Sequence, residues 1–291
     1  MIGHSGGGHD DLSLLTSWSF DPLALVAIAV AAVLYYRRAA TLARRGSAVA
    51  GWRRVSFGTG LALLAFALFS PIDAWGEEQF FFVHMTQHIL TGELAPLAIV
   101  AGLTGPLLRP VLQFRVVQAL RALAHPLVAW PLWALNLYVW HLPGMYEAAL
   151  GSTPLHAAEH VCFFTAGLLF WAPVLEPLPA PRWFGTGAKL LYIVGARFTS
   201  MVLANILIWN SGAVYGSYVH DVAPYGISSR ADQGIAGSVM MIVDSVVTIA
   251  AIAWLFLKLA SESERRQRLI EQGADPETAA RTVRYGRGQM S

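Results

Sequence analysis

The stretch FFFVHMTQHILTGELAPLAIVAGL, residues 80–103, decides the fold, because it is mostly apolar yet carries two histidines. A membrane-spanning helix needs about 20 mostly apolar residues, so this stretch is long enough to cross a bilayer. His84 and His88 are four residues apart, and a helix places such residues on one face, roughly 6 Å apart. His156 and His160 repeat this spacing in another apolar stretch. We therefore expect two membrane helices that each present two imidazoles on one face.

The whole chain has the composition of an integral membrane protein. Of its 291 residues, 55% are hydrophobic and 13% are charged, whereas a soluble domain carries about 25% charged residues. The sequence therefore predicts an all-α integral membrane protein, a bundle of seven transmembrane helices. The expected spans are 21–36, 55–72, 80–103, 124–142, 155–175, 188–210 and 233–258.

Basic residues mark one side of the predicted membrane. The loops after the first, third and fifth spans and the C-terminal tail are rich in arginine and lysine. Because cytoplasmic loops carry an excess of Lys and Arg, this pattern places the N-terminus outside and the C-terminus in the cytoplasm. We divide the chain into an extracytoplasmic Gly/His-rich arm (1–20), a seven-helix transmembrane domain (21–258) and a cytoplasmic tail (259–291). In the tail, a short amphipathic helix is expected over 260–272 and a second one from Asp275.

With this orientation, most histidines fall on or just beneath the outer face. At 1.5 Å per residue, the two histidine pairs lie between the outer surface and roughly 12 Å below it. His141 ends the fourth span outside, Asp232 opens the seventh, and Met240 has a depth similar to that of His88. We expect no catalytic residue. The candidate metal ligands are His84, His88, His141, His156, His160, Asp232 and Met240.

Other residues of the same types are expected to be structural. His4 and His9 in the arm and His220 in the last outer loop are interpreted as loop residues rather than ligands. Met85 and Cys162 do not share a face with the neighbouring histidine pairs, so we expect both to pack. A single cysteine excludes an internal disulfide and a CxxC metal motif. No basic run interleaved with aromatic residues points to nucleic acid.

The donor types favour copper. Imidazole with thioether, and few carboxylates nearby, suits copper better than magnesium or calcium, and zinc also fits histidine. Facing histidines on two spans also hold haem in membrane cytochromes, but the staggered depths here resemble a ladder rather than a flat pair. The segment His156–His160 has the order HxxEH of an inverted zinc protease, yet no soluble catalytic domain accompanies it. Interhelical hydrogen bonding in a packed bundle is the structural alternative.

Arg197 falls halfway along the sixth expected span, where an unpaired arginine would be very costly. Asp244 and Glu93 have a similar expected depth. We predict that Arg197 pairs with one of them, with Asn136 and Asn205 as polar neighbours. The pair is interpreted as an internal link between spans, and a proton or ion path is the alternative.

Taken in order, the motifs resemble a known family, the CtaG family of cytochrome c oxidase assembly factors in its multi-span form. The resemblance runs across nearly the whole chain and is weakest in the first span, the arm and the tail. The residues that carry it are Ser70-Pro71-Ile72-Asp73, His84-Met85-Thr86-Gln87-His88, Trp140-His141-Leu142-Pro143 with Tyr146, Leu155-His156-Ala157-Ala158-Glu159-His160, and Asp232-Gln233 with Met240.

The resemblance implies a seven-span protein of the bacterial inner (cell) membrane that helps a haem-copper oxidase to mature. Its implied role is copper supply through a metal site on the extracytoplasmic side, a chaperone role in the respiratory chain that requires no enzymatic activity. The implied partners are the copper-bearing subunits of cytochrome c oxidase and the lipid bilayer. A copper donor protein and a homodimer are further partners that this reading allows. A haem-binding membrane electron-transfer protein is the alternative function.

Overall fold

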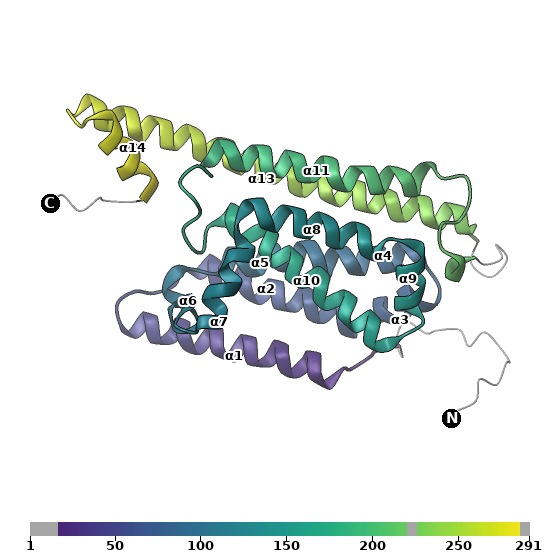
Figure 1. Cartoon of the computed structure of the whole chain (residues 1–291). Helices are drawn as coiled ribbons and strands as arrows, with labels where there is room; N and C mark the ends of the chain where they lie inside the picture. Colours follow the sequence, from purple (N-terminus) through teal and green to yellow (C-terminus); the bar gives the residue numbers. More distant parts are fainter. Residues whose placement is uncertain (1–16, 220–225, 286–291) are drawn as a thin grey trace.

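The computed structural model describes residues 17–219 and 226–285, and this part of the chain contains helices and no strand (Figure 1). His4, His9, His220 and most of the predicted arm lie outside the described residues. The helices are α1 (Pro22–Arg44), α2 (Gly51–Phe69), α3 (Ile72–Glu78), α4 (Phe81–Ile89), the π-helical turn η1 (Leu90–Leu94), α5 (Ala95–Gly102), α6 (Gly105–Leu112), α7 (Arg115–Leu120), the 3-10 turn η2 (Arg121–Ala124), α8 (Pro126–Trp140), α9 (Pro143–Leu150), α10 (Thr153–Leu175), α11 (Thr186–Trp209), the 3-10 turn η3 (Gly216–Tyr218), α13 (Ser229–Glu271) and α14 (Pro276–Tyr285).

Within the described residues, four helices, α1, α10, α11 and α13, are long and apolar enough to cross a membrane by themselves. Two bent combinations raise the number to six: α2 with α3, at 45°, and Phe81–Gly102 with α6, at 97°. The remaining predicted span, 124–142, folds as α8 with 15 residues, fewer than the about 20 that a bilayer requires. The predicted membrane bundle is thus confirmed as a class of fold, with four to six candidate spans.

The decisive stretch 80–103 folds as helix, but not as one uniform helix. The π-helical turn η1 separates α4 from α5 directly after the histidine pair. Gly167 on α10 faces this turn so closely that a Cβ atom there would lie 2.1 Å from the Gly92 carbonyl oxygen. The absence of a side chain at Gly167 therefore lets the two histidine-bearing segments approach each other.

The last span and the first part of the tail form one helix. The sequence predicted a separate helix over 260–272, but α13 runs through residue 258 without a break to Glu271. The physical reason is that neither Gly nor Pro occurs between Gly237 and Gly273, which follows the helix with a positive φ of 91°. The predicted start of the next helix is confirmed, because Asp275 accepts hydrogen bonds from the backbone N–H groups at the start of α14. Hydrogen bonds from Thr278 lower the pKa of Asp275 below its usual value.

Helices α11 and α13 run side by side along one flank of the bundle, and α1 lies on the opposite flank (Figure 1). Between these flanks, α4, α8 and α10 meet at the end of the bundle that also holds α3 and α9 (Figure 1). We call it the histidine end. An aromatic core stabilises it, with Phe81, Tyr146, Tyr215 and Tyr218 all buried.

Candidate metal centre

The two histidine pairs meet. One ligand atom from each of His84, His88, His156 and His160 lies within 4.8 Å of the others, and all four side chains are buried. We call these residues the four-histidine centre. The i,i+4 spacing on α4 and on α10 places each pair on one face, as the sequence predicted, and the packing of the two segments brings those faces together.

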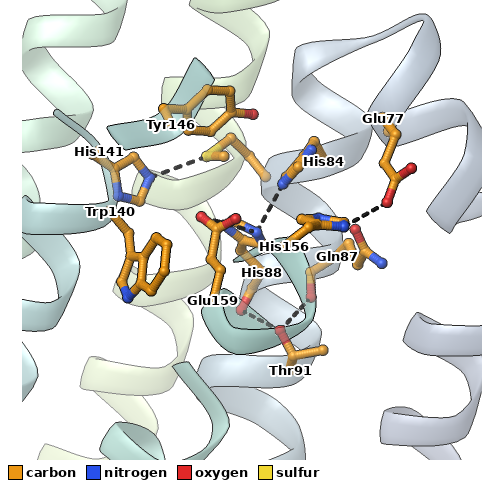
Figure 2. A network of polar contacts seen from close by, with 12 residues as sticks. Glu77, His84, Gln87, His88, Thr91, Trp140, His141, Tyr146, His156 and Glu159 are labelled. Atoms are coloured by element: carbon orange, nitrogen blue, oxygen red, sulfur yellow. Dashed lines mark hydrogen bonds and ion pairs between the residues drawn. The ribbon is translucent and has the colours of Figure 1, made fainter. Parts of the chain in front are cut away.

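The hydrogen bonds of His84 fix its tautomer. Its Nδ1 lies 3.0 Å from the Tyr218 hydroxyl oxygen, and Tyr218 donates its own proton to the Gly76 carbonyl at 2.6 Å. The Tyr218 oxygen must therefore accept from His84 Nδ1–H. The lone pair of His84 Nε2 then points to His88 Nε2, 2.8 Å away (Figure 2).

His156 is oriented in the same way by a carboxylate. Its Nδ1 lies 2.5 Å from Glu77 Oε1 at the end of α3 (Figure 2), whereas its Nε2 is buried and has no hydrogen-bond partner among the described residues. Metal-binding histidines usually donate their second ring N–H to a carboxylate or a carbonyl, which leaves the other nitrogen free for the ion. Both His84 and His156 follow this pattern.

Glu159 adds a buried carboxyl group beside the imidazoles. Its side chain is 1% exposed, and its Oε1 lies 3.7 Å from His88 Nε2 (Figure 2). Burying a carboxylate without a partner costs several kcal/mol, and buried polar atoms are normally paired. The atoms at this centre that lack a hydrogen-bond partner among the described residues are His88 Nδ1, His156 Nε2, His160 Nε2, Glu159 Oε1 and Glu159 Oε2.

A cation would satisfy these buried atoms, since it accepts lone pairs from imidazole nitrogens and neutralises the carboxylate. The donor set of four imidazoles and one carboxylate fits a transition metal such as copper or zinc. It does not fit magnesium or calcium, which prefer oxygen ligands.

The other predicted ligands lie near the centre but do not join the four histidines. His141 Nε2 lies 3.4 Å from the Met85 sulfur, and Met240 lines the same small cavity as His88 and His141. The Asp232 carboxylate accepts hydrogen bonds from the backbone N–H groups of Phe81 and Phe82, both at 2.9 Å. It therefore holds the start of α4.

Sequence reasoning missed several residues of the site. Met85 packs in the buried core as expected, and His141 at the end of α8 also reaches its sulfur, a contact that the sequence did not indicate. Glu159 belongs to the HxxEH segment and to the stretch that carries the family resemblance but was not predicted as a ligand, although its position beside His160 was a usable signal. No local pattern in the sequence indicates that the segments carrying Glu77 and Tyr218 lie next to the histidines.

The predicted pairing of Arg197 is confirmed. Its guanidinium lies 3.6 Å from the Asp244 carboxylate and donates hydrogen bonds to Ser245 at 2.9 Å and to the Met241 carbonyl at 3.2 Å. Glu93 lines one small cavity together with Arg197 and Asp244. The two asparagines expected nearby bond elsewhere, Asn136 to Trp140 and Asn205 to Met201.

Comparisons with known proteins identify the family. A family model described as cytochrome c oxidase caa3 assembly factor (Caa3_CtaG) matches residues 33–262, more than three quarters of the chain. Two uncharacterized proteins, from Mycobacterium bovis and Mycobacterium tuberculosis, are each 24% identical to it in an alignment 288 positions long that covers 91% of this chain and 43% of theirs. The chain thus spans less than half the length of these curated relatives. No solved structure matches it significantly. The chain belongs to the family of cytochrome c oxidase caa3 assembly factors.

Proposed function

We propose that this assembly factor binds copper at the four-histidine centre and supports its insertion into cytochrome c oxidase. The observation that supports this most is the set of buried nitrogen and oxygen atoms of His88, His156, His160 and Glu159 that lack hydrogen-bond partners within residues 17–219 and 226–285. Copper is favoured over zinc because the family serves an oxidase, which itself contains copper. Delivery needs ligands that exchange, not a catalysed reaction, so we infer that the chain is not an enzyme.

We further infer that the chain crosses the inner membrane seven times, with its N-terminus outside. The 3-10 turn η2 and α8 together cover residues 121–140, which at 1.5–2.0 Å per residue span about 30 Å, enough for a seventh crossing. The arginine-rich loops then lie in the cytoplasm, and the histidine end faces the extracytoplasmic side. A copper donor and the copper-bearing oxidase subunits would both reach the centre from there.

A haem-binding electron-transfer protein is the second candidate, since two histidine pairs face each other. Four ligand atoms within 4.8 Å favour a single ion. A bis-histidine haem instead places one nitrogen on each side of a flat macrocycle, with only two ligands.

Metal analysis of the purified protein tests the proposal. We expect copper in the wild type and a loss of at least about tenfold in His84→Ala and His160→Ala, because each variant removes a ligand. His125→Asn is the matched control, since His125 lies far along the chain from the centre and acts as the cap of α8, a role asparagine retains. Unchanged copper in both alanine variants, or a haem Soret band in the wild type, would overturn the proposal.

A further inference from the structure

A pair of unprotonated donor atoms lies beside the four-histidine centre. His141 Nδ1 is 2.7 Å from the Leu137 carbonyl oxygen, which can only accept, so the neutral ring carries its proton on Nδ1. The lone pair of Nε2 therefore points at the Met85 sulfur, 3.4 Å away. A thioether has no proton to donate. Two electron-pair donors thus face each other with no hydrogen between them.

The separation of these atoms suits a shared ion. Metal bonds are about 2.0 Å to an imidazole nitrogen and about 2.3 Å to sulfur. An ion at those distances from atoms that lie 3.4 Å apart would have a bond angle of roughly 105°, which is near tetrahedral. Met85 and His141 therefore need little movement to bind one ion together.

A third donor lines the same space. A cavity of about 50 Å³ is lined by Met85, His88, His141 and Met240, and the Met240 side chain is 6% exposed. Two thioethers and one imidazole form a softer donor set than four imidazoles and a carboxylate, and thioethers select Cu(I). We propose that Met85, His141 and Met240 form a second metal site, specific for Cu(I).

The proposed Cu(I) site adjoins the four-histidine centre through His88. The His88 ring centroid lies 6.3 Å from that of His141, and His88 also lines the cavity. An ion could pass between the two sites by exchanging one ligand at a time, without crossing lipid. This inference rests on the proposed uptake of copper and adds a second position for the ion. It involves no change of oxidation state.

Anaerobic titration of the full-length protein in detergent with Cu(I), against a chromophoric Cu(I) chelator, tests the second site. We expect two equivalents in the wild type and one in Met85→Leu and Met240→Leu, which conserve side-chain volume. Met201→Leu is the matched control on the partly exposed face of α11 and should keep two.

A wild type that binds one equivalent, or a Met85→Leu variant that keeps two, would overturn the second site. The titration gives different results when the second Cu(I) site is wrong and when the proposed copper function is wrong. If only the second site is wrong, one equivalent remains in the wild type and is lost in His84→Ala. If the copper function is wrong, the wild type binds no copper.

Discussion

Hydrogen bonds to the outer nitrogens of the imidazoles orient the rings of the centre. Tyr218 accepts from His84, and Glu77 accepts from His156, so the inner nitrogens of both rings carry a lone pair rather than a proton. Partners of this kind raise the basicity of a metal ligand and fix its tautomer. Tyr218 and Glu77 would thus orient the rings toward an ion without touching it.

Glu159→Gln tests two effects that we assign to the buried carboxyl group, one on copper affinity and one on the stability of the copper-free protein. We expect copper affinity to fall by about ten- to a hundredfold, since a negative charge next to the ion is lost. The copper-free protein should melt at a higher temperature, because an amide costs less to bury beside the imidazoles than a carboxylate does. Copper titration and thermal unfolding after chelation measure both quantities.

The matched control for Glu159→Gln is Glu147→Gln, since Glu147 is a carboxylate of the same end that hydrogen-bonds Ser217. It should leave copper affinity unchanged. Unchanged affinity in Glu159→Gln, or a lower melting temperature of its copper-free form, would contradict the assigned role.

The residues that sequence could predict are those whose arrangement is local. The spacing of His84 and His88 guarantees a shared face on any helix. The contact of Met85 with His141 depends on where α8 crosses α4. The position of Met85 around its own helix therefore does not predict this contact. Charge balance did predict the pairing of Arg197 with Asp244, because an isolated charge in the bundle would be too costly.

At the scale of elements, the centre depends on how closely α10 approaches the 80–103 segment. Gly167 lies against Gly92 in the π-helical turn, and Gly92 in turn packs on Phe163. π-helical turns often accompany functional sites. Here the turn follows His88 directly and adjusts the helix between the centre and Pro96. The sequence predicted one continuous span here. It could not indicate the π-helical turn, because the residue that approaches this turn, Gly167, lies on a helix distant in the chain.

Gly167→Val should push the two histidine pairs apart. The added Cβ would meet the Gly92 oxygen at 2.1 Å, so α10 must shift, and we expect both thermal stability and copper content to fall. Overpacking of this kind costs about 1–3 kcal/mol or more. Gly234→Ala on α13 is the control, because a Cβ there meets nothing within 4 Å. Full copper content in Gly167→Val would show that this approach does not position the centre.

For the whole molecule, the placement of charge separates two ends. The histidine end carries the buried donors, whereas most arginines fall in the segments 37–54, 109–121 and 265–284, toward the opposite end of the bundle. Hydropathy predicted the helical bundle correctly, since a continuous apolar stretch of this length satisfies its own backbone hydrogen bonds in lipid when it folds as a helix. It overestimated the length of α8, because Pro126 and Pro143 bound that helix at 15 residues.

Cysteine labelling tests the predicted orientation. In a Cys162→Ala background, Gly144→Cys at the histidine end should react with a membrane-impermeant thiol reagent in intact cells. Ser263→Cys on the far part of α13 should react only after the membrane is permeabilised. Both positions are exposed, so accessibility of the side chain does not limit the reaction. The reverse pattern would place the centre on the cytoplasmic side and remove the proposed route to the oxidase.

X-ray absorption at the copper edge tests the central claim most directly, on purified Met85→Leu protein loaded anaerobically with one equivalent of Cu(I), so that only the four-histidine centre is occupied. The account predicts a first shell dominated by imidazole nitrogens at about 2.0 Å, with the multiple scattering typical of histidine rings. His84→Ala and His160→Ala should each reduce that imidazole signal. A spectrum without imidazole scattering, or one that neither substitution changes, would contradict a copper centre built from the two histidine pairs.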